Sequence, residues 1–145
     1  MLSNLFAYLK HEQILLEEMV ELAQRLQKAL VKFDTVNLED ITTYQAALAK
    51  GLREAEEQRI NLLMAWLNIS KAEAASLRLS SIESHLNQDE IHRVRLVRKN
   101  LRELVNQLQQ TNTTNRLLAN RGRASVREIL SIFTNGNNVV CNVKV

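Results

Sequence analysis

The sequence predicts an all-α protein, an elongated antiparallel bundle or coiled-coil hairpin of long helices. Its 145 residues include no proline and only three glycines, so signals for tight turns are few. Aromatic residues make up 4% of the chain, whereas the strong helix formers Leu, Ala, Glu, Gln and Arg are abundant. The length suits one domain with a modest core. We expect three long helices, a short connecting helix and a mobile amphipathic helix at the C-terminus.

The first helix is expected over residues 2–33, where apolar residues recur in heptads. One core position holds Leu2, Leu9, Leu16, Ala23 and Leu30, and the other holds Leu5, Glu12, Met19, Leu26 and Phe33. The stretch FDTVN then interrupts the pattern. Asn37 is the expected N-cap of the next helix, because Glu39 and Asp40 follow in the first turn, where the helix dipole favours acids.

The second helix is expected over residues 38–68. One core position holds Ile41, Leu48, Ala55, Leu62 and Ile69, and the other holds Leu38, Gln45, Leu52, Arg59 and Trp66. A turn between Thr35 and Val36 makes the two helices antiparallel and pairs residues whose numbers sum to 71. Glu12 then faces Arg59, so we predict a structural ion pair that fixes the register more than it adds stability. A functional role for the pair, as an acid and an anion binder, is the less favoured alternative.

Two further helices follow. Ser70 and Glu73 form a capping box that opens a short helix over residues 71–79, and SSIESHLNQ is expected to be a linker. The third long helix begins at Asn87 or Asp89 and runs to residue 120. Its apolar set is Ile91, Val94, Val97, Leu101, Leu104, Val105 and Leu108. We therefore divide the chain into a bundle, residues 1–120, and an amphipathic helix with a flexible tail, residues 121–145.

The stretch TNTTNRLLANRGRASVREIL, residues 111–130, combines weak helix formers with a later apolar stripe. Thr and Asn lower helix stability there, and Thr111 and Asn115 occupy core positions where they should contribute little burial. Beyond Gly122, apolar residues recur at helical spacing in VREILSIF. Two interpretations are equally supported: a fourth helix folded back on the bundle with Gly122 near the turn, or a detachable helix that docks on a partner.

No catalytic, cofactor or metal site is predicted. His11, His85 and His92 are too far apart to share a metal, and the chain has no Gly-rich phosphate loop, nucleophile elbow or Cys-x-x-Cys motif. The single cysteine, Cys141, cannot form an intrachain disulfide. The N-terminus is a poor secretory signal, and no apolar run approaches the length of a membrane span. These features favour a cytoplasmic protein that is not an enzyme.

Charge is distributed unevenly along the chain. Residues 1–90 hold 9 Lys/Arg and 14 Asp/Glu, whereas residues 91–145 hold 10 and 2. The basic third could attract nucleic acid, an acidic protein or a membrane surface, or it could face the acidic half of the same molecule. The strongest candidate set for nucleic acid spreads around the helix without interleaved aromatics: Arg93, Arg95, Arg98, Lys99 and Arg102. A basic nucleic-acid binder and a helical coiled-coil scaffold are therefore alternatives only.

Three segments resemble the FlgN-like family of flagellar type III export chaperones. They are EEQRINLLMAWL (residues 56–67), LRELVNQLQQTNTTNRLL (101–118) and VREILSIF (126–133). The clearest match is the step formed by Asn112, Asn115 and Leu118. The chain departs from the family at its end, NGNNVVCNVKV, where the family often has an aromatic residue and glycine in a disordered segment.

This resemblance implies binding to the C-terminal helical regions of flagellar hook-associated (hook–filament junction) proteins, here called clients. The chaperone would prevent their premature assembly and present them to the flagellar export apparatus. The residues expected to contact the client are Leu117, Leu118, Arg123, Val126, Arg127, Ile129, Leu130 and Phe133. The two arginines would steer an acidic client. No small-molecule substrate is implied, and a homodimer is left open.

Overall fold

Five helical segments make up the protein in a computed structural model that describes residues 2–136, with side chains described for residues 2–132. They are α1 (Leu2–Lys32), α2 (Thr35–Leu67), α3 (Lys71–Ser76), the 3-10 helix η1 (Leu79–His85) and α4 (Gln88–Gly136). No strand occurs within residues 2–136. The predicted all-α fold class is confirmed. Cys141 and most of the predicted tail lie outside the described residues.

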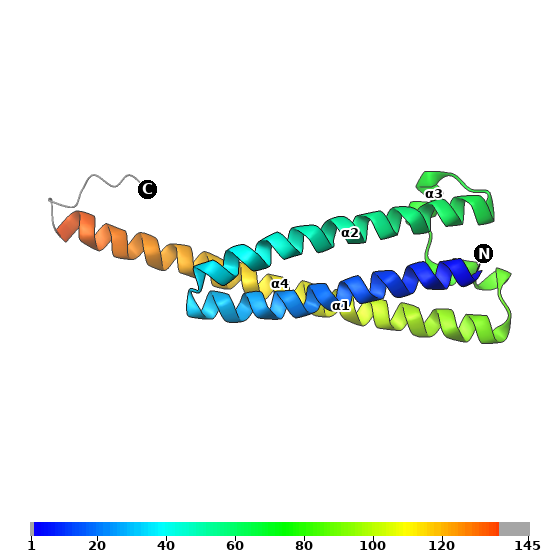
Figure 1. The fold of residues 1–145 in the computed structure, drawn as a ribbon, viewed down its shortest axis with the longest axis horizontal. Coiled ribbons are helices and arrows are strands. Elements are labelled where there is room, and N and C mark those ends of the chain that lie inside the picture. Colours follow the sequence, from blue (N-terminus) through cyan, green and yellow to red (C-terminus); the bar gives the residue numbers. More distant parts are fainter. Residues whose placement is uncertain (1, 137–145) are drawn as a thin grey trace.

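The three long helices do not all pack against one another. α1 and α2 form an antiparallel hairpin, and α4 runs parallel to α1 (Figure 1). α1 packs against both other helices, but within residues 2–136 no Cα atom of α2 lies within 8 Å of one in α4. α1 is therefore the central helix, and its surface between α2 and α4 is not closed by direct helix packing.

The turn between α1 and α2 is tighter than the sequence predicts. Asp34, not Asn37, is the N-cap of α2, and its Oδ1 accepts from the backbone N–H of Asn37 at 3.3 Å. α1 ends in a Schellman motif, with the N–H of Asp34 donating to Ala29 O (3.0 Å) and that of Phe33 donating to Leu30 O (3.3 Å). Phe33 occupies the left-handed position of this motif, with φ of 53°. The predicted cap at Asn37 is wrong because Asp34 caps the helix three residues earlier.

The connection from α2 to α4 contributes to the core. Ser70 caps α3 as predicted, accepting from Glu73 N–H at 3.2 Å, although α3 ends at Ser76 and not at residue 79. The expected linker SSIESHLNQ is largely the 3-10 helix η1, whose Ile82 is fully buried. Asn87 caps α4, because its Oδ1 accepts from Glu90 N–H (2.9 Å) while Glu90 Oε1 accepts from Asn87 N–H (3.0 Å).

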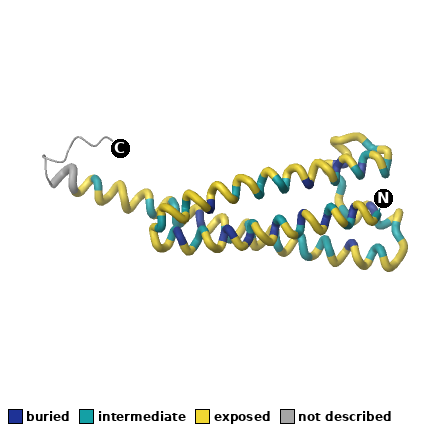
Figure 2. The backbone as a smooth tube through the Cα atoms, viewed as in Figure 1, coloured by how far each residue is buried: buried dark blue, intermediate teal, exposed yellow. Residues whose placement is uncertain are grey.

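The main core lies at the end of the bundle that holds the N-terminus, α3 and η1, here called the closed end. Buried positions also continue along α1 toward the other end (Figure 2). The buried side chains of the main core come from all five helical segments: Leu5, Leu9, Ile60, Leu63, Ala74, Ile82 and Val94. Nearby, Arg59 Nε donates to Glu12 Oε1 at 2.9 Å, and both side chains are largely buried. The ion pair therefore joins α1 and α2 in the register that the heptads predict.

The other end, at the turn around Phe33, is here called the open end. A smaller cluster of Leu22, Ala29 and Ile41 is buried there. α4 runs past the turn and extends beyond the hairpin (Figure 1).

α4 crosses residues 111–122 without interruption. The predicted end at residue 120 and the folded-back fourth helix are both wrong. The hydroxyls of Thr113 and Thr114 donate to the carbonyls of Gln109 (2.9 Å) and Gln110 (3.2 Å), so these side chains are satisfied inside the helix. The expectation of little burial at Asn115 is also wrong, since this residue is buried and its Nδ2 donates to Ala23 O at 2.8 Å. The division of the chain at residue 120 into two functional parts stays a prediction.

Candidate docking groove

A groove opens where α2 and α4 fail to meet. Its first part, with a volume of ≈ 630 Å³, has a floor from α1 and walls from α2 and α4. The lining residues are Met19, Leu26, Leu30, Leu38, Thr42, Gln45, Ala46, Ala49, Leu108, Asn112, Asn115, Arg116 and Ala119. Most of these side chains are apolar, and the polar ones are Thr42, Gln45, Asn112, Asn115 and Arg116.

A second part of ≈ 430 Å³ continues over the turn toward the end of α4. It is lined by Leu30, Phe33, Leu38, Leu118, Ala119, Gly122, Arg123, Val126 and Arg127. Because Leu30, Leu38 and Ala119 line both parts, the two form one continuous surface, here called the α2–α4 groove. It follows α4 from Leu108 to Arg127.

Small residues create the hollow on the α2 side. Thr42, Ala46 and Ala49 recur at intervals of four and three residues, which places them on one face of the helix toward α4. Short side chains at these positions leave the floor of α1 uncovered. Closer to α3, α2 carries the larger residues Leu63 and Trp66, which belong to the main core or pack against it.

Phe33 and Gly122 meet where the groove passes the turn. A Cβ atom added at Gly122 would lie 3.2 Å from Phe33 Cε1, so glycine lets the ring approach α4 closely. Phe33 nevertheless stays 62% exposed. The prediction that Phe33 is a core residue is therefore wrong, because the left-handed end of α1 turns this side chain outward. Gly122 lies inside α4, where it allows the close approach of Phe33, and it does not lie near a turn as predicted.

Arginines supply all the charge of the groove. Arg116, Arg123 and Arg127 line it, and no Asp or Glu does so. Their spacing of seven and four residues puts them on one face of α4. Among the described residues no side chain of these three makes a hydrogen bond or ion pair. The groove therefore presents a row of unpaired positive charges beside an apolar floor.

Basic residues at the start of α4 are instead engaged within the chain. Arg95 Nε and Nη2 donate to the two carboxylate oxygens of Glu83 at 3.0 and 3.1 Å. These hydrogen bonds lower the pKa of Glu83 and raise that of Arg95. The guanidinium of Arg93 lies 4.4 Å from the centre of the Phe6 ring. These contacts occupy two members of the basic set that the sequence offers for nucleic acid.

The structure brings together half of the predicted client contacts. Leu118, Arg123, Val126 and Arg127 line the groove. Leu117 is exposed but does not line it, and Ile129 is exposed beyond its end. Leu130 is half-buried, and the Phe133 side chain lies outside the described part.

The hairpin also contributes residues that were not predicted from the sequence, namely Phe33, Leu38 and the face of α2 that carries small residues. The repeat of Thr42, Ala46 and Ala49 is visible in the sequence, but it indicates a groove only when the position of α4 is known.

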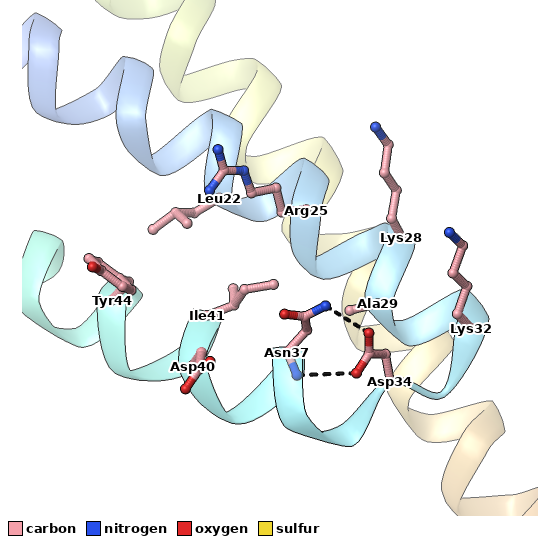
Figure 3. A pocket seen from close by; sticks show the side chains of 10 residues that line it. All are labelled: Leu22, Arg25, Lys28, Ala29, Lys32, Asp34, Asn37, Asp40, Ile41 and Tyr44. Atoms are coloured by element: carbon pink, nitrogen blue, oxygen red, sulfur yellow. Dashed lines mark hydrogen bonds between the residues drawn. The ribbon is translucent and has the colours of Figure 1, made fainter.

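A second hollow, of ≈ 330 Å³, lies on the other flank of the hairpin (Figure 3). No residue of α4 lines it. The three positive charges of Arg25, Lys28 and Lys32 on α1 are partly offset there by Asp34 and Asp40 at the start of α2. Asp34 already accepts from Asn37 through both carboxylate oxygens, at 3.3 and 2.7 Å. This hollow contains the N-cap residue of α2, and it carries charges of both signs, unlike the α2–α4 groove.

Neither a metal cluster nor a membrane-spanning helix occurs among the described residues. No group of three or more His, Cys, Asp and Glu side chains within them could hold a metal ion. No helix across residues 2–136 combines the length and apolar character needed to cross a membrane.

Comparison with protein families identifies the kind of molecule that carries this groove. The chain matches the family described as FlgN protein over residues 1–142. It belongs to the FlgN family. FlgN proteins are flagellar export chaperones and not enzymes, so the general role of this chain is in flagellar assembly and export. Searches of curated proteins and of solved structures found no match to it.

Proposed function

We propose that this FlgN protein binds the C-terminal helical regions of flagellar hook-associated proteins in the cytoplasm. Binding keeps these clients from assembling prematurely, and the chaperone then delivers them to the flagellar type III secretion apparatus. The part of α4 beyond Gly122 provides the apolar contacts, and Arg123 and Arg127 steer the client during association.

The observation that supports this most directly is the apolar stripe on the distal part of α4. Val126, Ile129 and Ile132 recur every three residues and are 49%, 53% and 65% exposed. Solvated apolar side chains at helical spacing fit the apolar face of a second helix. A client segment that forms such a helix would gain about 25 cal/mol for each Å² of apolar surface removed from water.

The decisive experiment compares the full chain with a chain ending after Arg121. Each is titrated calorimetrically with C-terminal segments of hook-associated proteins. The full chain should bind and the shortened chain should not, because the stripe is missing. Equal binding by both would contradict a role for the stripe, and absence of binding by both would contradict the proposed clients.

A pair of point variants separates the stripe from general effects on α4. Ile129→Glu places a charge on the apolar stripe, whereas Ala124→Glu places the same charge on an exposed position across the helix. We expect Ile129→Glu to weaken client binding about tenfold or more, with little change for Ala124→Glu. Both variants should keep the thermal stability of the parent, because both positions are exposed.

The alternative functions predict different behaviour in the same assays. A nucleic-acid binder would lose affinity steeply between about 50 and 200 mM salt, whereas an apolar helix contact would persist. A coiled-coil scaffold would self-associate without any client. Either result would contradict the proposed client binding and would favour the corresponding alternative function.

A further inference from the structure

We infer that the α2–α4 groove receives an acidic amphipathic helix of the client, so that the α1–α2 hairpin binds the client together with α4. The identity of the client rests on the function proposed above. The position and charge of its helix rest on the structure.

The shape of the groove fits a helix. From Leu108 to Arg127 it extends about 28 Å along α4 at 1.5 Å per residue, which is about five helical turns. Its floor is α1, and its walls belong to two helices that do not approach within 8 Å of each other. A helix placed there would contact all three long helices and would complete a four-helix arrangement at the open end.

The charge of the groove selects the kind of helix. Three arginines on one face of α4 line it, all unpaired among the described residues, and no acid is present. A complementary helix carries carboxylates beside its apolar stripe, spaced by about seven and four residues to meet Arg116, Arg123 and Arg127. Basic helices are disfavoured by the same arginines.

The same charge argues against a second copy of the chain in a symmetric pairing. In a two-fold interface each copy presents the same surface to the other. Two α2–α4 grooves facing each other would bring their arginine rows together, with no acid from either lining to compensate. A client helix with acidic flanks avoids this repulsion.

The critical variants replace two neighbouring alanines on α2. Ala46 lines the groove, and Ala47 borders the opposite flank of the helix beside Leu22 and Tyr44. Both are exposed, so Ala46→Glu and Ala47→Glu alter no buried contact and carry the same cost in helix propensity. Ala46→Glu fills the hollow and adds a negative charge where the acidic helix is expected to lie. Ala46→Lys adds similar bulk with the opposite charge.

The first probe is a designed peptide with a leucine stripe and glutamates at the stated spacing, compared with the same peptide carrying lysines. The full chain should bind the glutamate peptide about tenfold more tightly than the lysine peptide. Ala46→Glu should weaken that binding about tenfold, Ala47→Glu less than about twofold, and Ala46→Lys less than Ala46→Glu. Equal affinity for the two peptides, no binding of either, or equal effects of the two glutamate variants would overturn the inference.

The second probe, the C-terminal segment of a hook-associated protein, separates this inference from the proposed function. If the segment binds and Ala46→Glu does not weaken it, the proposed function stands and the groove inference fails. If the segment does not bind while the glutamate peptide does, the groove inference stands and the proposed client is wrong. Sedimentation equilibrium on the chain alone tests whether a second copy occupies the groove. A dimer that Ala46→Glu breaks and Ala47→Glu leaves intact would show such an occupant and would overturn the inference.

Discussion

The closed and open ends of the bundle are built from the same helices but packed differently. At the closed end, α3 and η1 connect α2 to α4 and add Ala74 and Ile82 to the core that these helices share, where both side chains are fully buried. At the open end no described segment covers the space between α2 and α4, and this space is the α2–α4 groove. Exposed apolar residues gather at the open end, among them Val31, Phe33, Val36, Val126 and Ile132.

This difference suggests a division of labour along the molecule. Three long helices with an inserted α3–η1 connection are enough to bury a core at one end. The other end holds its hairpin together through a small cluster and leaves a surface that a partner helix can cover. Stability and binding should therefore respond to substitutions at different ends of the molecule.

The largest expected effect is on stability at the closed end. Leu63 is fully buried in the main core, so Leu63→Ala should lower the free energy of unfolding by about 2–5 kcal/mol. Leu38 at the open end is half-buried and lines the groove, so Leu38→Ala should cost less stability and weaken client binding instead. Urea denaturation and calorimetric titration of both variants measure the contrast. Similar stability losses at the two positions would erase the distinction between the ends.

The ion pair between α1 and α2 comes next. Arg59→Met leaves the Glu12 carboxylate largely buried without its partner, so the free energy of unfolding should fall by about 1–3 kcal/mol. Replacing both residues by methionine should recover most of the loss, because no unpaired charge remains. Chemical denaturation of the two single variants and the double variant forms the required cycle. A double variant as unstable as Arg59→Met would show that the pair contributes more than register.

The fold could be predicted in most respects because its determinants are local or periodic. Heptads define α1 and α2, and the short break between them gives the register that joins Glu12 to Arg59. The N-caps at Ser70 and Asn87 mark helix starts through contacts three residues apart. The continuity of α4 was missed because Asn115 gains its burial and its hydrogen bond from α1, a contact 92 residues distant in sequence.

The candidate site was only partly predictable for a similar reason. The apolar stripe and arginines of α4 are visible as a pattern in one segment. The groove also depends on which face of α2 lies toward α4 and on the left-handed backbone at Phe33. Neither is fixed by the local sequence, since a phenylalanine at a heptad core position normally indicates burial. Small residues on α2 carried a signal only once the position of α4 was known.

Phe33 offers a test in which stability and binding change in opposite directions. Its φ of 53° is a conformation that glycine adopts without strain, so Phe33→Gly should raise the free energy of unfolding by about 1 kcal/mol. The same change removes an exposed ring from the groove, so the affinity for the client segment should fall. Thermal denaturation and titration on one preparation give both values. Loss of stability would instead show that the contact of the ring with Gly122 matters more than backbone strain.

The smallest effect concerns the ion pair between Glu83 of η1 and Arg95 of α4 at the closed end. Hydrogen bonds from Arg95 hold the pKa of Glu83 below its usual value of 4.5. A lowered pKa in the folded state means that this pair stabilises the fold above about pH 4.5 and that the contribution disappears as the pH falls through the lowered pKa. Arg95→Gln should return the pKa of Glu83 toward 4.5 and make stability less dependent on pH in this acidic range. Carboxyl NMR titration and denaturation between about pH 3 and 6 measure both. An unchanged Glu83 pKa in the variant would mean that this ion pair does not persist in solution, and the burial of apolar side chains such as Ile82 and Leu79 would then hold η1 in place.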